Sequence, residues 1–80
     1  MSREKTDQIL VIEGRVEITQ SDGGYRSILL SEIVEVVSLS VVEMWRLGIR
    51  LRGDMDFVWV AQWRNPVTAR KNARYVAGAI

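Results

Sequence analysis

Two apolar runs decide the fold of this chain: WRLGIRL at residues 45–51 and FVWVAQW at residues 57–63. Large apolar residues alternate through the first run, so they share one face of a strand while arginines share the other. Gly53 and Asp54, between the runs, are typical of a hairpin turn. The two runs contain all three tryptophans and the only phenylalanine. We therefore expect a β-hairpin whose apolar face forms the centre of the core.

The length of the turn determines which residues of the two strands lie opposite each other. A two-residue turn places Ile49 opposite Val58, whereas a three-residue turn places Ile49 opposite Trp59. A shift of one residue moves every side chain of one strand to the other face. We prefer the three-residue turn, because it joins large apolar residues on one face and opposite charges on the other. The core residues predicted from it are Trp45, Leu47, Ile49, Leu51 and Trp59.

The length and composition of the chain restrict the class of protein. Its 80 residues suffice for one domain with a small core. The sequence has no cysteine and no histidine, which removes disulfides, thiolate ligands and the usual proton shuttle. The polar first residues do not resemble a signal peptide, and no apolar run is long enough to cross a membrane. We expect a cytoplasmic protein.

The first part of the chain is typical of a tail followed by two strands. Residues 1–7 contain little to bury, so we expect a mobile tail ahead of one domain over residues 8–80. Apolar residues then alternate up to residue 20 and predict one long amphipathic strand. Gly14 lies on its apolar face, where a bulge, a bend or a large neighbouring side chain would explain it. Residues 21–24 are turn formers, which predicts a hairpin to a second strand at residues 25–30.

A third strand, the central hairpin and a helix complete the pattern. After a short break, residues 33–37 are typical of a strand, and residues 38–43 either continue it or loop outward. Asn65 followed by Pro66 predicts the start of a helix, because asparagine caps free backbone N–H groups and proline fits the first turn. The expected buried face of this helix consists of Ala69, Ala73, Val76, Ala77 and Ile80.

Together these elements predict an α+β fold. We expect a five-stranded, mostly antiparallel β-meander, as a curled sheet or partial barrel, with one C-terminal α-helix packed on it beside the tryptophans. In the order of its elements alone, ending in a hairpin and a helix, the chain is similar to pleckstrin-homology-like domains. It is short for a complete fold of that kind.

Constellations of catalytic or metal-binding residues are nearly absent from the sequence. The serines have no histidine to activate them. Asp54 and Asp56 are close enough in sequence to share a hard cation, but two carboxylates do not make an oxygen shell. Arg52-Gly53-Asp54 matches an integrin-binding tripeptide in letters, and here it is typical of a strand end and a turn. We therefore expect no enzyme activity, no cofactor and no metal.

Positive charge is concentrated in the second half of the chain. Residues 1–43 contain four basic and eight acidic residues, and residues 44–80 contain seven and two, for net charges of −4 and +5. Arginines interleaved with aromatic residues are typical of single-stranded nucleic-acid binders. In the preferred register, however, the tryptophans face the core and offer no stacking platform. Nucleic-acid binding is therefore the second interpretation, with these candidate contacts: Arg46, Arg50, Arg52, Arg70, Lys71 and Arg74.

Valines on the second face of the strands favour a different function. One helix covers one face of a sheet, yet valines alternate with the aromatic residues of the last strand, and residues 33–37 are apolar on both faces. Strands of this kind are buried on both faces, either by a curled sheet or by a partner. The first interpretation is therefore a protein-interaction or self-assembling module, most simply a homodimer. Its candidate surface consists of Val34, Val36, Val58 and Val60.

Overall fold

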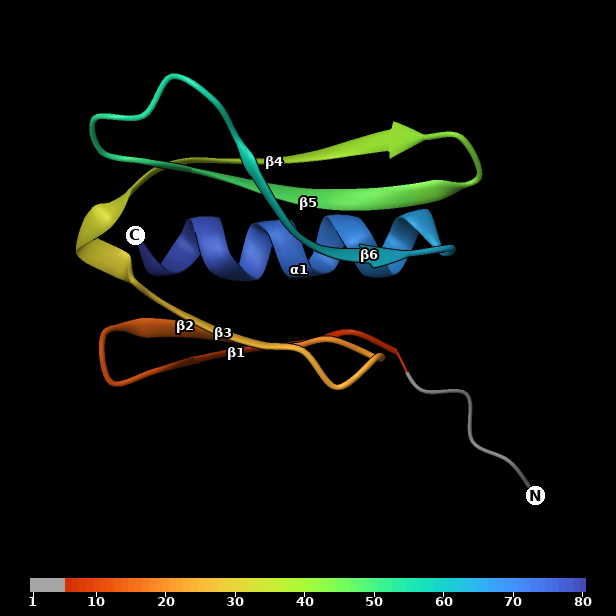
Figure 1. Ribbon diagram of the computed structural model, residues 1–80, viewed down its shortest axis with the longest axis horizontal. Helices are drawn as coiled ribbons and strands as arrows, with labels where there is room; N and C mark the ends of the chain where they lie inside the picture. Colours follow the sequence, from red (N-terminus) through yellow and green to blue (C-terminus); the bar gives the residue numbers. More distant parts are fainter. Residues whose placement is uncertain (1–5) are drawn as a thin grey trace.

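Two three-stranded antiparallel sheets and one helix make up the fold (Figure 1). A computed structural model describes residues 6–80 of the chain. The strands of the first sheet are β1 (Gln8–Ile12), β2 (Arg15–Thr19) and β3 (Tyr25–Leu29). Those of the second sheet are β4 (Ile33–Val41), β5 (Met44–Leu51) and β6 (Val58–Trp63). A short 3₁₀ turn, η1 (Leu30–Glu32), joins the sheets, and helix α1 (Pro66–Ala79) follows β6 and lies between them.

The predicted long first strand is a hairpin. Its two-residue turn is Glu13-Gly14, where both residues have positive φ angles, of 50° and 75°. Such turns match the natural twist of a β-hairpin. The reversal changes which positions face inward, so that Val16 is buried whereas Leu10 and Ile12 are exposed. The α+β class is confirmed. The prediction of five strands in one meander is wrong, because this turn divides the first strand in two and the six strands form two separate sheets.

The second sheet begins with a strand longer than the sequence pattern predicted. β4 continues to Val41, and a two-residue turn, Val42-Glu43, leads back into β5. A bulge at Val34 interrupts the pairing near the start of the strand. Among the described strands β4 pairs only with β5, so its other edge is free of strand pairing.

The β5–β6 hairpin follows both of the predicted registers, one on each side of a bulge. At its open end Trp45 lies opposite Trp63, as a three-residue turn predicts. Closer to the loop Ile49 lies opposite Val58, as a two-residue turn predicts. Val60 is the extra residue between the two parts.

This bulge decides which side chains reach the core. Val60 is fully buried, whereas Trp59 lies opposite Gly48 on the outer face of the sheet and is 39% exposed. The prediction of Trp59 as a core residue is therefore wrong. Among the other four predicted core residues, Leu47 and Ile49 are fully buried. Trp45 and Leu51 are partly buried and pack against the core.

The helix begins where the sequence predicts. The side-chain oxygen of Asn65 accepts a hydrogen bond from the backbone N–H of Val67 at 2.9 Å, and Pro66 occupies the first helical position. On the predicted buried face of the helix, Ala69 and Val76 are fully buried and Ala73 is partly buried. Ala77 and Ile80 are exposed. No helix within residues 6–80 has the length and apolar character needed to cross a membrane.

The core contains side chains from both sheets and from the helix. Small residues on α1 allow the helix to pack closely between the sheets, where it contacts β1 on one side and β4, β5 and β6 on the other. The first and second sheets therefore share one core. Its buried apolar residues are Val16, Ile18, Ile28, Ile33, Leu47, Ile49, Val60, Ala61, Trp63, Ala69 and Val76.

Candidate functional site

Asp7 ties the two sheets together just ahead of β1. Its Oδ1 accepts a hydrogen bond from the backbone N–H of Ser21 at 2.7 Å, and its Oδ2 accepts one from the N–H of Gln62 at 2.9 Å. Its backbone carbonyl accepts a hydrogen bond from the indole Nε1–H of Trp63 at 2.9 Å. Asp7 is only 8% exposed and belongs to the folded domain. Asp7, the last residue of the predicted tail, is therefore held by both sheets, and the first five residues of that tail lie outside the described residues.

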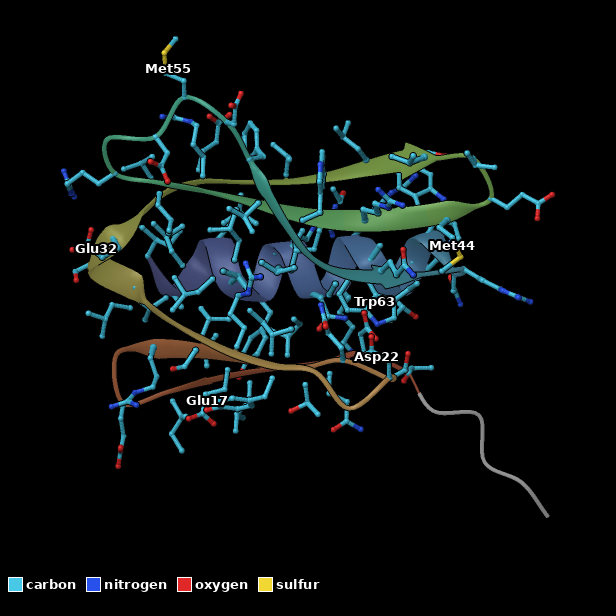
Figure 2. The ribbon with its side chains drawn as sticks, in the orientation of Figure 1. Glu17, Asp22, Glu32, Met44, Met55 and Trp63 are labelled. Carbon is cyan, nitrogen blue, oxygen red and sulfur yellow. The ribbon has the colours of Figure 1, made fainter. Side chains whose placement is uncertain are left out.

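Gln20 makes a second link between the sheets. Its side-chain Nε2 donates a hydrogen bond to the carbonyl of Val60, at 3.1 Å. Bulges disrupt the regular ladder, so the carbonyl at this position gains a partner from the first sheet. Figure 2 shows Asp22 of the β2–β3 turn and Trp63 of β6 at this same end of the molecule. We call the region that links the sheets the junction; its residues are Asp7, Gln20, Ser21, Val60 and Gln62.

A pocket of about 370 Å³ opens at the junction. This volume falls at the lower end of the range found for small-molecule sites. The lining combines polar groups of the β2–β3 turn with side chains of the second sheet. It includes Asp7, Ser21, Asp22, Arg46, Trp59 and Gln62.

Arg46 and Trp59 are the unusual members of this lining. The Nε atom of Arg46 is buried and has no hydrogen-bond partner within residues 6–80. A buried donor without a partner costs about 1–3 kcal/mol, so each such atom in a protein calls for an explanation. Trp59 offers a partly exposed ring, and the ring of Phe57 stacks on it with centroids 6.3 Å apart. The lining of the pocket therefore combines the side chain of Arg46 with an accessible aromatic ring.

The predicted polyanion contacts on β5 are partly occupied by other groups. The Nε of Arg50 lies 3.2 Å from Oε1 of Glu35 in an ion pair across the outer face. Arg52 donates a hydrogen bond to the carbonyl of Ser31 at 3.2 Å. Arg46, with its buried Nε, lies in the junction pocket.

The predicted contacts on the helix belong to another side of the molecule. The guanidinium of Arg70 lies 5.7 Å from the centre of the Trp45 ring, on the face of the second sheet that α1 covers. Lys71 and Arg74 are exposed on the same helix. Arg46 and Arg50 extend from the opposite face of β5, so the six predicted contacts do not form one continuous surface.

The predicted interaction surface is also divided. Val60 is fully buried, and Val36 and Val58 are partly buried against the core. Val34 is the exposed member of the set, at 39%. The four valines therefore do not make one surface that a partner can reach.

Another apolar surface lies on the outer face of β4. Ser38 lies opposite the core residue Leu47, so it faces the interior, and its neighbours on either side face outward. These neighbours include Leu39, which is 48% exposed. We call Val37, Leu39 and Val41 the outer β4 stripe. Sequence reasoning missed the stripe because it left this segment open, although the alternation Val-Ser-Leu-Ser-Val was a usable signal.

The acidic side chains of the described residues do not form a metal site. Asp54 and Asp56 are both exposed in the β5–β6 loop. Throughout the described range, residues 6–80, no three acidic side chains gather closely enough to hold a metal ion. The outer β4 stripe and the junction pocket are thus the two candidate sites. No family model, no curated protein and no solved structure matches the chain.

Proposed function

We propose that the protein is a non-enzymatic interaction module that associates with a second copy of itself through the outer β4 stripe. The observation that carries the proposal is the reversed polarity of this strand. From Val37 to Val41, β4 places its apolar side chains on the outer face of the sheet and its serines on the face that carries Leu47, although Ser40 remains exposed. A strand that packs one face on a core normally does the opposite.

The edge of β4 adds to this argument. The strand is nine residues long, and among the described strands it pairs on one side only. Edge strands of monomeric proteins are usually protected by lysine, by proline or by a covering segment. β4 contains neither lysine nor proline, and Glu35 is its one charged residue. Its free edge and its apolar stripe lie on the same strand, so one partner strand can engage both.

Charge and symmetry favour a second copy as the partner. A two-fold axis at Leu39, the middle of the stripe, places Val37 of one copy against Val41 of the other, so the apolar stripe is complementary to itself. The net charge of the chain is +1, which leaves little repulsion between copies.

Sedimentation velocity at tens of micromolar protein tests the proposal. We expect the wild-type protein to sediment as a dimer and Leu39→Lys as a monomer, since a lysine at this position would have to be desolvated in the contact. Leu10→Lys is the matched control. Leu10 has the same exposed fraction, 48%, but lies on the first sheet, so this variant should remain dimeric. A monomeric wild-type protein, or equal dissociation of both variants, would contradict the proposal.

A second candidate function is single-stranded nucleic-acid binding. It is favoured by one observation, the partly exposed ring of Trp59 beside the same pocket as Arg46. Aromatic faces next to cations bind stacked bases and phosphates. The experiment is titration of a labelled oligonucleotide at low and at physiological salt, where the logarithm of affinity should fall with log salt by about 0.7 per phosphate contact. Absence of binding at low salt would eliminate this function.

A further inference from the structure

The junction pocket contains hydrogen-bonding groups of both kinds. Arg46 can only donate, and its Nε is buried with no partner in the described part of the chain. Asp22 can only accept. Its Oδ1 takes the backbone N–H of Gly24 at 2.9 Å, and this is the one hydrogen bond of its carboxylate within residues 6–80. A ligand that suits the pocket therefore has donors on one edge and acceptors on another.

The charge of the lining argues against a phosphate inside the pocket. Arg46 contributes one positive charge, whereas Asp7 and Asp22 contribute two negative charges. A bare anion would meet net repulsion here, but a neutral ring would not. The ring of Trp59 is the natural contact for such a ligand, because flat aromatic groups stack on an exposed indole.

We propose that the junction pocket binds a guanine base. Guanine stacks on Trp59, presents its adjacent N1–H and N2–H donors to the carboxylate of Asp22, and presents O6 and N7 to the guanidinium of Arg46. The other bases fit less well. Adenine and cytosine have an acceptor beside their amino group, and uracil has a single N–H between two carbonyls.

The ligand has two possible sources, a free guanine nucleotide or a guanine in a single strand. In both, the phosphate remains outside the pocket. The proposal goes beyond self-association, and it adds base selectivity to the second candidate function. Nucleic-acid binding and the guanine pocket can fail separately. Salt-sensitive binding without preference for a base would support nucleic-acid binding and contradict the guanine pocket.

The test uses the full chain and follows the indole N–H signal of Trp59 by NMR, assigned through a Trp59→Phe variant. The titrated ligands are guanosine, GMP, adenosine and cytidine. We expect guanosine and GMP to bind with similar affinity, and adenosine and cytidine to bind at least about tenfold more weakly. Short oligonucleotides with and without guanine form the second arm. If guanosine and GMP bind at least as tightly as the guanine oligonucleotide, the ligand is the free nucleoside or nucleotide. If the guanine oligonucleotide binds much more tightly than guanosine, the ligand is a guanine within a single strand.

Three variants separate the roles of the pocket residues. Asp22→Asn should remove the preference for guanine, because an amide N–H₂ replaces one of the two carboxylate oxygens. Arg46→Gln should lower the affinity for guanosine at least about tenfold. Arg50→Gln, outside the pocket lining, should bind like the wild-type protein, and circular dichroism verifies that each variant is folded. Equal affinity for all nucleosides, no binding of any guanine ligand, or unchanged binding by Asp22→Asn and Arg46→Gln would overturn the proposal.

Discussion

The indole ring of Trp59 lies against Gly48 of the neighbouring strand. A β-carbon built on Gly48 would lie 2.7 Å from Cζ3 of that ring and 3.2 Å from Cγ2 of Val37. These distances are below normal van der Waals separation, so only glycine lets the ring rest on the strand at this point. Together with the bulge at Val60, this contact fixes Trp59 on the outer face and makes it available to the junction pocket.

Gly48→Ala should therefore displace the Trp59 ring. We expect a loss of about 1–3 kcal/mol in the free energy of unfolding, because the added methyl group overpacks the contact. The indole N–H signal of Trp59 should also shift. Gly78→Ala is the matched control, since a β-carbon there would meet no atom within 4 Å and alanine favours a helix. Unchanged stability and an unmoved Trp59 signal in Gly48→Ala would contradict this packing.

Much of the fold could be predicted from local signals. The Asn65-Pro66 helix start and the turn at residues 21–24 each rest on residues with one strong structural preference, and both are present. The Glu13-Gly14 turn was missed because glutamate is an unusual residue at a positive φ angle. The bulge at Val60 was missed because nothing in an alternating pattern shows where one extra residue is inserted.

The junction was harder to predict than the hairpins. Asp7 and Gln62 are 55 residues apart, and the polar residues before the first strand had no visible partner in the sequence. Trp59 was assigned to the core because a large aromatic residue normally belongs there. The register shift places Trp59 on the outer face instead. It therefore supplies an aromatic face for stacking, whose expected absence had counted against nucleic-acid binding.

The hydrogen bonds of Asp7 should contribute to stability. Asp7→Ala removes the acceptors of the Ser21 and Gln62 N–H groups, and we expect a loss of about 1.5–3 kcal/mol in chemical denaturation. Asp22→Ala is the control. Its carboxylate accepts one exposed hydrogen bond within the β2–β3 turn, so the loss should be about 1 kcal/mol or less. Equal stability of the two variants would show that Asp7 does not hold the sheets together.

Val42 is a position where substitution should stabilise the protein. It is a β-branched residue at φ 57° in the β4–β5 turn, and it is 92% exposed. Val42→Gly should relieve strain of about 1 kcal/mol and raise Tm by about 4–8 °C for a domain of this size. Val42→Thr keeps the branched side chain and should leave Tm nearly unchanged. A lower Tm for Val42→Gly would contradict the strained turn.

The two tryptophans of β6 should differ sharply in their contribution to stability. Trp63 is 4% exposed, belongs to the core and donates its indole N–H to the Asp7 carbonyl. Trp63→Ala should cost about 3–5 kcal/mol, which is a large part of the total stability of a small domain. Trp59→Ala should cost about 1–2 kcal/mol, because its ring lies on the outer face and buries less apolar area. Urea denaturation of both variants measures the difference. A Trp59→Ala protein as unstable as Trp63→Ala would contradict the bulge and return Trp59 to the core.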